Sequence, residues 1–309
     1  MYLEHFGLRE TPFTLTPDTS FFYAYDSHVA TLNTLLVALR SGDGFIMVTG
    51  EVGTGKTLLC RKLLSSLRNE EFVTAYIYNP YLEPMTLLYA VADELRVQYK
   101  DKLNQHQLLK VITKALIDFY AAGKRVALCL DEVQAMPVET LETLRLLTNL
   151  ETEKRKLLQV VLFGQPELHQ VLDQPSVRQL KQRIVFSHSL LPLDRDGTEG
   201  YVMHRLTVAG YNGKRLFTGD ALRDLYRASG GIPRLVNVIC HKALMAAYGQ
   251  GKRSVERRHM RLAVQDTLGG DVVPPAASHR WAYSLLGAGG LLLLAAGGYY
   301  YYGANLFPA

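Results

Sequence analysis

The sequence predicts an α/β protein in which a parallel-sheet domain is followed by a small helical domain and one apolar C-terminal helix. Three observations predict this order. A short apolar run leads into a glycine-rich motif at residues 50–57 and then into a helical pattern. Two later apolar runs end in polar residues, as buried parallel strands do. After Leu193 the strand pattern stops, and apolar residues recur with the helical period.

The composition is that of a globular protein, because 48% of the 309 residues are hydrophobic and 20% are charged. This excludes a disordered chain, a collagen-like chain and a disulfide scaffold. The three cysteines (Cys60, Cys129 and Cys240) lie far apart in apolar stretches, which indicates a reducing compartment and gives no metal-site spacing. The net charge of +5 is concentrated in residues 252–261, where five Lys or Arg accompany one Glu. A nearly neutral remainder argues against binding to a nucleic-acid backbone.

The first expected strand, Phe45–Thr49, leads directly into the sequence GEVGTGKT. This is a P-loop in its required context of strand, loop and helix, and it predicts a site for ATP with Mg²⁺. The glycines let backbone N–H groups face the phosphates, and the following helix directs its positive end toward them. Lys56 is expected to reach the β- and γ-phosphates, and the Thr57 hydroxyl to bind Mg²⁺. The expected nucleotide-binding residues are Gly50, Glu51, Val52, Gly53, Thr54, Gly55, Lys56, Thr57 and Leu58.

A second expected strand ends at Leu130 and is followed by Asp131 and Glu132. Its continuous apolar run indicates a parallel strand buried on both faces, and open α/β sheets bind ligands at the carboxyl ends of such strands. Asp131 is expected to hold Mg²⁺ through its water shell. Glu132 is expected to polarise the water that attacks the γ-phosphate. The alternative is a solvated strand end, which is less favoured because a P-loop precedes this pair.

A third expected strand, Leu157–Phe163, is followed by Gln165, which could sense the γ-phosphate or orient water. The alternative for Gln165 is a turn-capping role. The next helical segment, 176–183, carries Arg178 and Arg183 and precedes an alternating strand. An arginine here could reach the γ-phosphate of a neighbouring subunit, and we favour Arg183 because it immediately precedes the strand. A solvated helix arginine is the alternative.

Residues 196–268 are expected to form a compact helical domain after an α/β domain of residues 1–195. Helix-period segments are expected at 198–209, 218–229, 233–248 and 255–267. Between the second and third of these, the glycines of the sequence GGIPR end one helix and Pro233 begins the next. Arg234 is thereby held at a helix start, where it can face the nucleotide across the domain cleft. A surface arginine is the alternative.

The segment 281–303 contains no charged side chain. Its 23 residues would span roughly 34 Å as a helix, which exceeds a hydrocarbon core of about 30 Å. Trp281 and Tyr283 at one end and tyrosines 299–302 at the other match the two interfacial aromatic belts. A single transmembrane helix is therefore expected. The alternative is a buried C-terminal helix of a soluble domain.

The flanking segments set the expected orientation of this span. A proline-containing linker is expected at 269–280 and a short periplasmic tail at 304–309. Because the basic residues precede the span, the positive-inside rule places residues 1–280 in the cytoplasm. For the basic run 252–261 three interpretations stay open: a solvated helix face, attraction to anionic lipid headgroups, and a weak contact with nucleic acid.

Together these residues resemble the AAA+ ATPases, through the P-loop, the Asp131-Glu132 pair, the polar strand tip at Gln165, the finger-like Arg183 and the Gly-x-Pro-Arg sequence ending at Arg234. The helical domain would then be the lid of that fold. The opening YLEHFGL and the sequences GQPEL and GGIPR resemble more closely the secretion ATPase family of general secretion pathway protein A, and within it the MSHA-type pilus biogenesis ATPases. The resemblance covers about residues 1–268.

The resemblance implies an inner-membrane ATPase with cytoplasmic catalytic domains that assemble as a ring, typically a hexamer. Such proteins support the building of a type IV pilus or a type II secretion machine together with other assembly proteins. It assigns nucleotide and Mg²⁺ binding to Lys56 and Thr57, the catalytic glutamate to Glu132 and the second sensor to Arg234. In general secretion A proteins a periplasmic peptidoglycan-binding domain follows the span. Only a few residues follow it here, so direct binding to peptidoglycan is not expected.

Two other functions stay open. A nucleotide-switched DNA-binding ATPase of the transposition or replication-initiator type shares much of this layout. Against it, no winged-helix domain fits between Thr267 and the apolar segment, and the body of the chain is nearly neutral. The other is a scaffold that binds ATP and hydrolyses it slowly or not at all, against which Glu132 argues.

Overall fold

The computed structural model describes residues 2–42, 44–67, 70–79, 81–100, 102–150 and 156–269. Residues Met1–Thr267 form one compact unit. The expected linker beyond Gly269, the expected transmembrane helix and the tail lie outside the described residues. Within the described part, no helix is both long enough and apolar enough to cross a bilayer.

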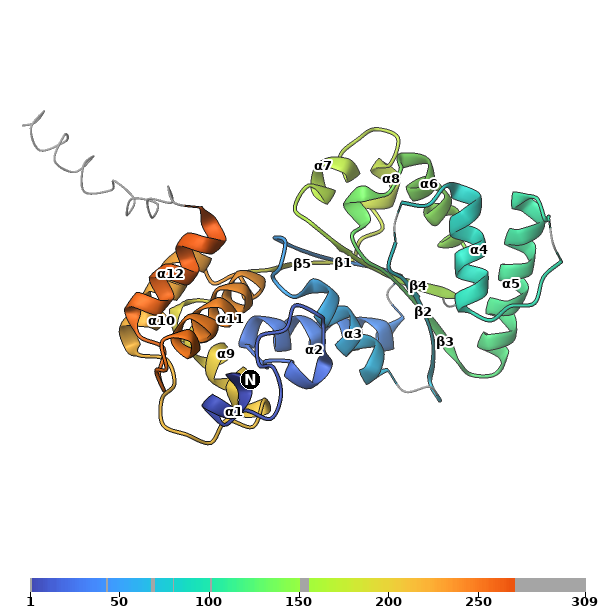
Figure 1. Cartoon of the computed structure of the whole chain (residues 1–309). Coiled ribbons are helices and arrows are strands. Elements are labelled where there is room, and N and C mark those ends of the chain that lie inside the picture. The colour runs from blue at the N-terminus through green and yellow to red at the C-terminus, as the bar shows by residue number, and fades with distance from the viewer. Residues whose placement is uncertain are drawn as a thin grey trace, which may run out of the picture. The chain divides into compact units, whose positions relative to one another are not determined.

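A parallel five-stranded sheet lies at the centre of the first part of the chain, with the order β2-β3-β4-β1-β5 (Figure 1). The strands are β1 (Phe45–Gly50), β2 (Phe72–Ile77), β3 (Arg125–Leu130), β4 (Leu158–Gly164) and β5 (Phe186–Leu190). Every residue of β1 and β4 is buried, which explains why these sequences are mostly apolar without alternation. Strand β2 was not predicted from the sequence, because it is an edge strand that mixes buried and half-buried positions.

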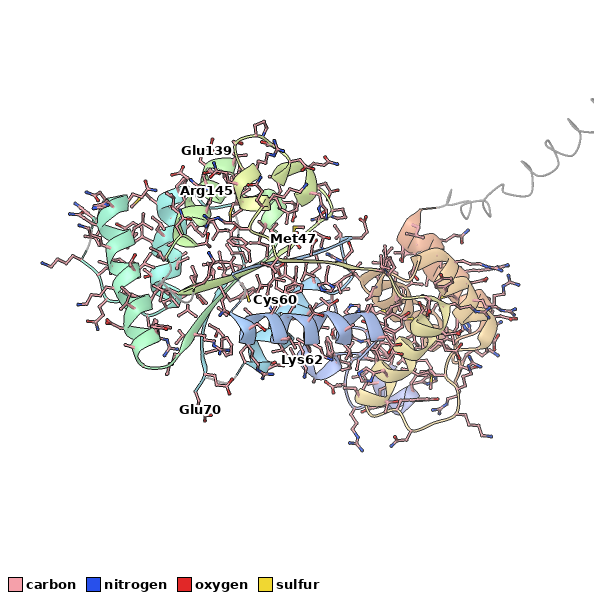
Figure 2. The ribbon with its side chains drawn as sticks, turned by 180° about the vertical axis from the view of Figure 1, so that it is seen from behind. Met47, Cys60, Lys62, Glu70, Glu139 and Arg145 are labelled. Carbon is pink, nitrogen blue, oxygen red and sulfur yellow. The ribbon has the colours of Figure 1, made fainter. Side chains whose placement is uncertain are left out.

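Helices cover both faces of the sheet, and alternate residues of each strand point to opposite layers. On one face, Phe45 and Met47 pack with the later helices of the domain; on the other, Ile46 and Val48 pack with two earlier helices. Met47 and Cys60 mark the two layers in Figure 2. The first layer holds α4 (Pro84–Glu94), α5 (Gln105–Ala121), α6 (Val138–Leu147), α7 (Leu168–Leu172) and α8 (Arg178–Lys181), and the second holds α2 (Asp26–Ser41) and α3 (Lys56–Ser66).

The helix expected at 176–183 is shorter than the pattern suggested. Only Arg178–Lys181 is α-helical, and Arg183 lies two residues beyond its end. The reason is that the backbone there forms hydrogen bonds of the 3₁₀ type, between residues three apart. Arg183 N–H donates to the Leu180 carbonyl, and Ile184 N–H donates to the Lys181 carbonyl.

In the described part of the chain, four helices follow the sheet; they occupy the segment predicted to be a lid, and we call them the lid. They are α9 (Arg195–Val208), α10 (Gly219–Ser229), α11 (Pro233–Gly249) and α12 (Arg257–Leu268). Gly230, in the left-handed conformation, ends α10, and Pro233 occupies the first turn of α11, as the glycine–proline pattern predicted. The last helix begins two residues later than expected, because Val255 forms a β-bridge with Phe217.

The N-terminal segment contributes to the hydrophobic core of the lid. It comprises α1 (Tyr2–Phe6), a stretch of turns and bends at residues 7–18, and a 3₁₀ turn, η1 (Thr19–Phe21). Its buried aromatic and aliphatic residues belong to the same cluster as those of α9, α10 and α11, and they are Phe6, Leu8, Phe13 and Phe21. Residues at opposite ends of the described chain therefore stabilise one small core.

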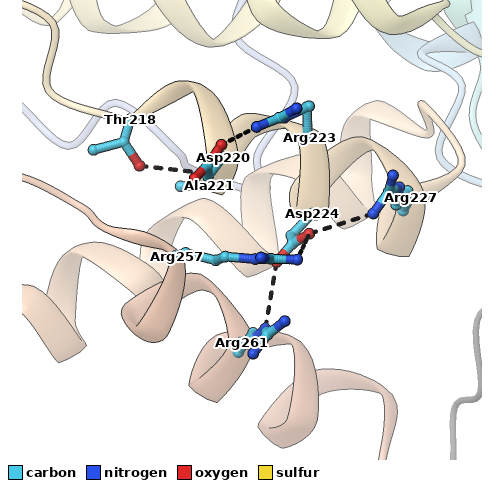
Figure 3. Close-up of polar contacts among 8 residues, drawn as sticks. All are labelled: Thr218, Asp220, Ala221, Arg223, Asp224, Arg227, Arg257 and Arg261. Atoms are coloured by element: carbon cyan, nitrogen blue, oxygen red, sulfur yellow. Dashed lines mark hydrogen bonds and ion pairs between the residues drawn. The ribbon is translucent and has the colours of Figure 1, made fainter.

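Part of the basic charge of residues 252–261 is balanced within the lid. Asp224 of α10 forms ion pairs with Arg257 at 2.8 Å and Arg261 at 3.5 Å on α12, and with Arg227 at 3.8 Å on its own helix (Figure 3). Three guanidinium groups thus share one carboxylate, and the surface retains a positive excess.

Candidate functional site

The P-loop connects the end of β1 to the start of α3. Gly53 and Gly55 have φ angles of +85° and +100°, in the left-handed region that glycine adopts without strain. A Cβ atom on Gly53 would lie 2.6 Å from the Cβ of Arg234, so a side chain there would also collide with the lid. Gly53 is therefore needed both for the turn and for the close approach of α11.

Lys56 begins α3 and points back into the loop. Its Nζ donates to the carbonyl oxygens of Gly50 at 2.7 Å and Glu51 at 3.1 Å, and the residue is only 4% exposed. Burial lowers the pKa of Lys56, while the negative charges of Glu132 and Asp131 oppose this change. The ammonium group is thus positioned inside the loop and close to the acidic pair.

Thr57 and Asp131 lie in direct contact across the site. The Thr57 hydroxyl donates to Asp131 Oδ2 at 2.6 Å. Burial raises the pKa of Asp131, and the hydrogen bonds from Thr57 and from the Glu132 N–H oppose that rise. A hydroxyl and a carboxylate are hard oxygen ligands of the kind Mg²⁺ prefers, so this donor pair fits the predicted metal.

Glu132 lies beside the side chains of two glutamines. Its Oε2 accepts hydrogen bonds from Gln134 Nε2 at 2.8 Å and Gln165 Nε2 at 3.0 Å. Burial raises the pKa of Glu132, but these two bonds and the charge of Lys56 outweigh it and hold the pKa below its ordinary value. Glu132 and Gln165, 33 residues apart, are therefore brought together at the tips of β3 and β4. Gln134 was not predicted as a site residue; its only signal in the sequence is a polar side chain shortly after the acidic pair.

A cavity of about 340 Å³ adjoins the P-loop and is lined by three parts of the chain and by Glu132. The P-loop and α3 contribute Val52, Gly53, Gly55, Lys56, Thr57 and Leu58, and the lid contributes Tyr201, Arg205, Pro233, Arg234 and Asn237. Glu132 also lines it. The backbone N–H of Arg234 donates to the Gly53 carbonyl at 3.2 Å, so the start of α11 lies against the loop.

The third wall of this cavity, residues 14–18, was not anticipated from the sequence. His28 of α2 was also missed. Its ring is hydrogen bonded through Nε2 to the Thr54 carbonyl at 2.9 Å, and burial lowers its pKa. The neutral ring thereby holds the P-loop backbone at Thr54. No sequence motif marks His28, because its role depends on where α2 packs.

The arginines expected near the sheet end are placed differently from Arg234. Arg183 donates to Thr148 Oγ1 of the same chain at 3.1 Å. Neither Arg178 nor Arg183 is among the described residues that line the cavity. A role for Arg183 toward a neighbouring subunit stays a prediction.

Comparison with known proteins identifies the type of domain that holds this site. A family model described as an AAA domain matches residues 39–172. General secretion pathway protein A of Aeromonas hydrophila is 45% identical over 269 residues, which cover 87% of this chain and 49% of that protein. The chain belongs to the AAA+ ATPase family of general secretion pathway protein A. The chain spans about half the length of that relative.

Solved structures with the same fold are much more distant in sequence. Cdc6p of Pyrobaculum aerophilum has a TM-score of 0.63 and 20% identity, and covers 82% of this chain and 72% of its own. Drosophila ORC bound to DNA has a TM-score of 0.62 and 18% identity over 84% of this chain and 64% of its own. RuvB of Thermotoga maritima has a TM-score of 0.54 and 15% identity, and the match covers 80% of this chain and 70% of RuvB. These likenesses confirm the parallel-sheet P-loop fold predicted from the sequence.

Proposed function

We propose that this chain is a membrane-anchored ATPase that hydrolyses ATP to support assembly of a type IV pilus of the MSHA type or of a type II secretion machine. The observation that carries the enzymatic part is that Lys56, Thr57 and Glu132 line one cavity, where the Thr57 hydroxyl is hydrogen bonded to Asp131. The relationship to general secretion pathway protein A supports the pathway.

In this proposal the triphosphate lies along the backbone N–H groups of residues 50–57, at the start of α3. Lys56 exchanges its carbonyl partners for the β- and γ-phosphate oxygens. Thr57 and Asp131 hold Mg²⁺, which neutralises charge on the phosphates when bound. Glu132 accepts a proton from the attacking water, and Gln165 and Arg234 contact the γ-phosphate from the sheet and the lid.

The subunits would assemble as a ring, typically a hexamer, in which Arg183 of one subunit acts on the nucleotide of the next. The apolar segment 281–303 would anchor the chain in the bacterial inner membrane, with the catalytic domains in the cytoplasm. Carbonate extraction of membranes tests the anchor, since a spanning helix stays in the pellet. Recovery of the chain in the carbonate supernatant would contradict it.

Two substitutions in the full chain test the enzymatic proposal. Lys56→Ala is expected to weaken ATP binding at least about tenfold, because it removes the charge that faces the phosphates. Glu132→Gln is expected to keep ATP affinity and lose about 10²-fold or more in kcat, which is typical of removing a general base. Mg²⁺-dependent phosphate release and equilibrium ATP binding measure both. Unchanged turnover in Glu132→Gln would assign water activation to another group.

A second candidate is a nucleotide-switched DNA-binding ATPase. The observation that favours it is the fold shared with Drosophila ORC, which is bound to DNA in its structure. Electrophoretic mobility shifts with duplex DNA, at increasing salt and with and without ATP, discriminate the two. Salt-sensitive, ATP-dependent binding would favour this candidate, and no binding at low salt would leave the assembly ATPase.

A further inference from the structure

Gln134 uses both ends of its amide group beside the proposed catalytic carboxylate. It lies on the 3₁₀ turn η2 (Val133–Ala135) that follows β3. Its Nε2 donates to Glu132 Oε2 at 2.8 Å, and its Oε1 accepts the backbone N–H of Gln165 at 2.9 Å. Since Gln165 also donates to Glu132 Oε2, the three residues close a ring of hydrogen bonds between the tips of β3 and β4.

Two backbone features make this ring possible. Glu132 adopts a left-handed conformation with φ +52°, which is unfavourable for a non-glycine residue and turns the chain sharply after β3. At the end of β4, a Cβ atom on Gly164 would lie 3.3 Å from Gln134 Oε1 and 2.7 Å from the Leu168 side chain. Glycine at 164 therefore leaves the room that the Gln134 amide occupies.

The ring treats the two carboxylate oxygens of Glu132 differently. Both amide donors bind Oε2. No hydrogen bond from the described residues reaches Oε1. Two donors on one oxygen restrict rotation of the carboxylate and leave the other oxygen free to accept a proton.

We propose that Gln134 is a positioning residue for ATP hydrolysis. It holds the carboxylate of Glu132 so that Oε1 can face the attacking water, and it links that carboxylate to the strand tip at Gln165. A shift of Gln165 toward a γ-phosphate would pull on the same amide and reorient Glu132. The inference rests on the proposed ATPase function and adds a residue to it.

The first test compares Gln134→Leu with wild type in the full chain. Leucine keeps approximate size but neither donates nor accepts, so kcat is expected to fall about 10- to 100-fold, as when a positioning partner is lost. The KM for ATP and the equilibrium ATP affinity are expected to stay within about threefold, because Gln134 does not line the cavity. The matched control is Gln265→Leu on the exposed side of α12, which should leave both constants unchanged.

Two further variants separate positioning from packing. Gln134→Glu keeps the size but places a second carboxylate against Glu132, so it should lower kcat at least as much as leucine does. Gln134→His should recover part of kcat, because a neutral imidazole also carries one donor and one acceptor. Equal kcat in all three variants and wild type would overturn the proposal. So would a parallel loss of ATP affinity and thermal stability in Gln134→Leu.

A double-mutant cycle with Gln165→Leu tests the shared oxygen. If both amides act through Glu132 Oε2, the double variant should lie only a few-fold below the worse single variant. Multiplication of the two single effects would overturn the shared ring. Wild type and Glu132→Gln are measured in parallel. If wild type releases no more phosphate than Glu132→Gln, the proposed function fails, whereas normal wild-type turnover with an unaffected Gln134→Leu removes only the role of Gln134.

Discussion

The adjacent glycines in the turn between α10 and α11 differ in what surrounds them. Both Gly230 and Gly231 have positive φ angles, +57° and +76°. A Cβ atom on Gly230 would meet open space, whereas one on Gly231 would overlap the carbonyl of Leu193. That carbonyl belongs to the residue whose N–H donates to the Gly231 carbonyl at 2.9 Å. A side chain at position 230 would therefore cause backbone strain alone, whereas one at position 231 would cause strain and a steric collision.

We expect Gly231→Ala to destabilise the protein far more than Gly230→Ala. Alanine at 230 should cost about 1 kcal/mol for its left-handed conformation alone. Alanine at 231 adds a collision with the backbone, for a total of roughly 3 kcal/mol or more. Urea denaturation followed by circular dichroism measures both, and equal losses would contradict the placement of Gly231 against Leu193.

The neutral state of His259 predicts a pH-dependent stability. Its Nδ1 accepts the Glu256 N–H at 3.0 Å, and its Nε2 is hydrogen bonded to Gln250 Oε1 at 3.1 Å. Burial first, then the charge of Arg258, lowers its pKa below the ordinary value. A base whose pKa is lowered by folding contributes stability above its unfolded pKa, about 6.5, and this is lost as the pH falls below that value.

Removing this imidazole should therefore flatten the acid side of the stability profile. Between pH 7 and pH 5, wild type is expected to lose more free energy of unfolding than His259→Gln does. Urea midpoints at pH 7, 6 and 5 give the comparison. A steeper loss in the variant would show that His259 is charged in the folded protein.

At the scale of elements, one arginine joins the N-terminal segment to the lid. Arg205 of α9 donates through Nε to the Pro12 carbonyl, through Nη1 to the Tyr201 hydroxyl at 3.0 Å and through Nη2 to Thr14 Oγ1 at 3.2 Å. Its guanidinium carbon lies 4.5 Å from the centre of the Phe21 ring. Because the residue is 4% exposed, its loss would leave buried acceptors without donors.

Arg205→Met is expected to cost about 2–4 kcal/mol of stability, from the lost hydrogen bonds to a charged group and the unpaired acceptors. It should also weaken ATP binding, since residues 14–18 line the cavity. The control is Arg215→Met, which removes a half-exposed ion pair with Glu199 and should cost under about 1 kcal/mol. Similar urea midpoints for the two variants would disprove a fastening role for Arg205.

At the scale of the assembled molecule, the trans role of Arg183 has a direct test. Arg183→Ala alone should lower ATP hydrolysis, because each site would lack the arginine of its neighbour. Mixing it with Lys56→Ala subunits should restore part of the activity. The Lys56→Ala subunits bind nucleotide poorly but still supply Arg183 to an intact site. Steady-state phosphate release across mixing ratios measures this rescue, and its absence would place Arg183 in its own subunit's site.

Several strands, the P-loop and some helix ends could be predicted from the sequence alone. Strands β1, β3 and β4 are local apolar runs, and the P-loop is a local spacing, so sequence alone located Lys56 and Thr57 at the start of α3. The helix starts and stops of the lid followed from Gly230 and Pro233. These features depend on residues that are close together in the sequence, within one helical turn or one strand, so the sequence pattern predicts them.

What only the tertiary structure decided is which distant segments meet. The sheet order carries Gln165 to Glu132, a turn of left-handed backbone directs Gln134 to both, and packing of α2 brings His28 against Thr54. The N-terminal segment joins the core of the lid, although no pattern in its residues predicts that contact. The periodicity of a segment shows which of its sides is apolar and will be buried. Which other segment it packs against depends on how well their side chains fit together and on which backbone N–H and C=O groups still need hydrogen-bond partners.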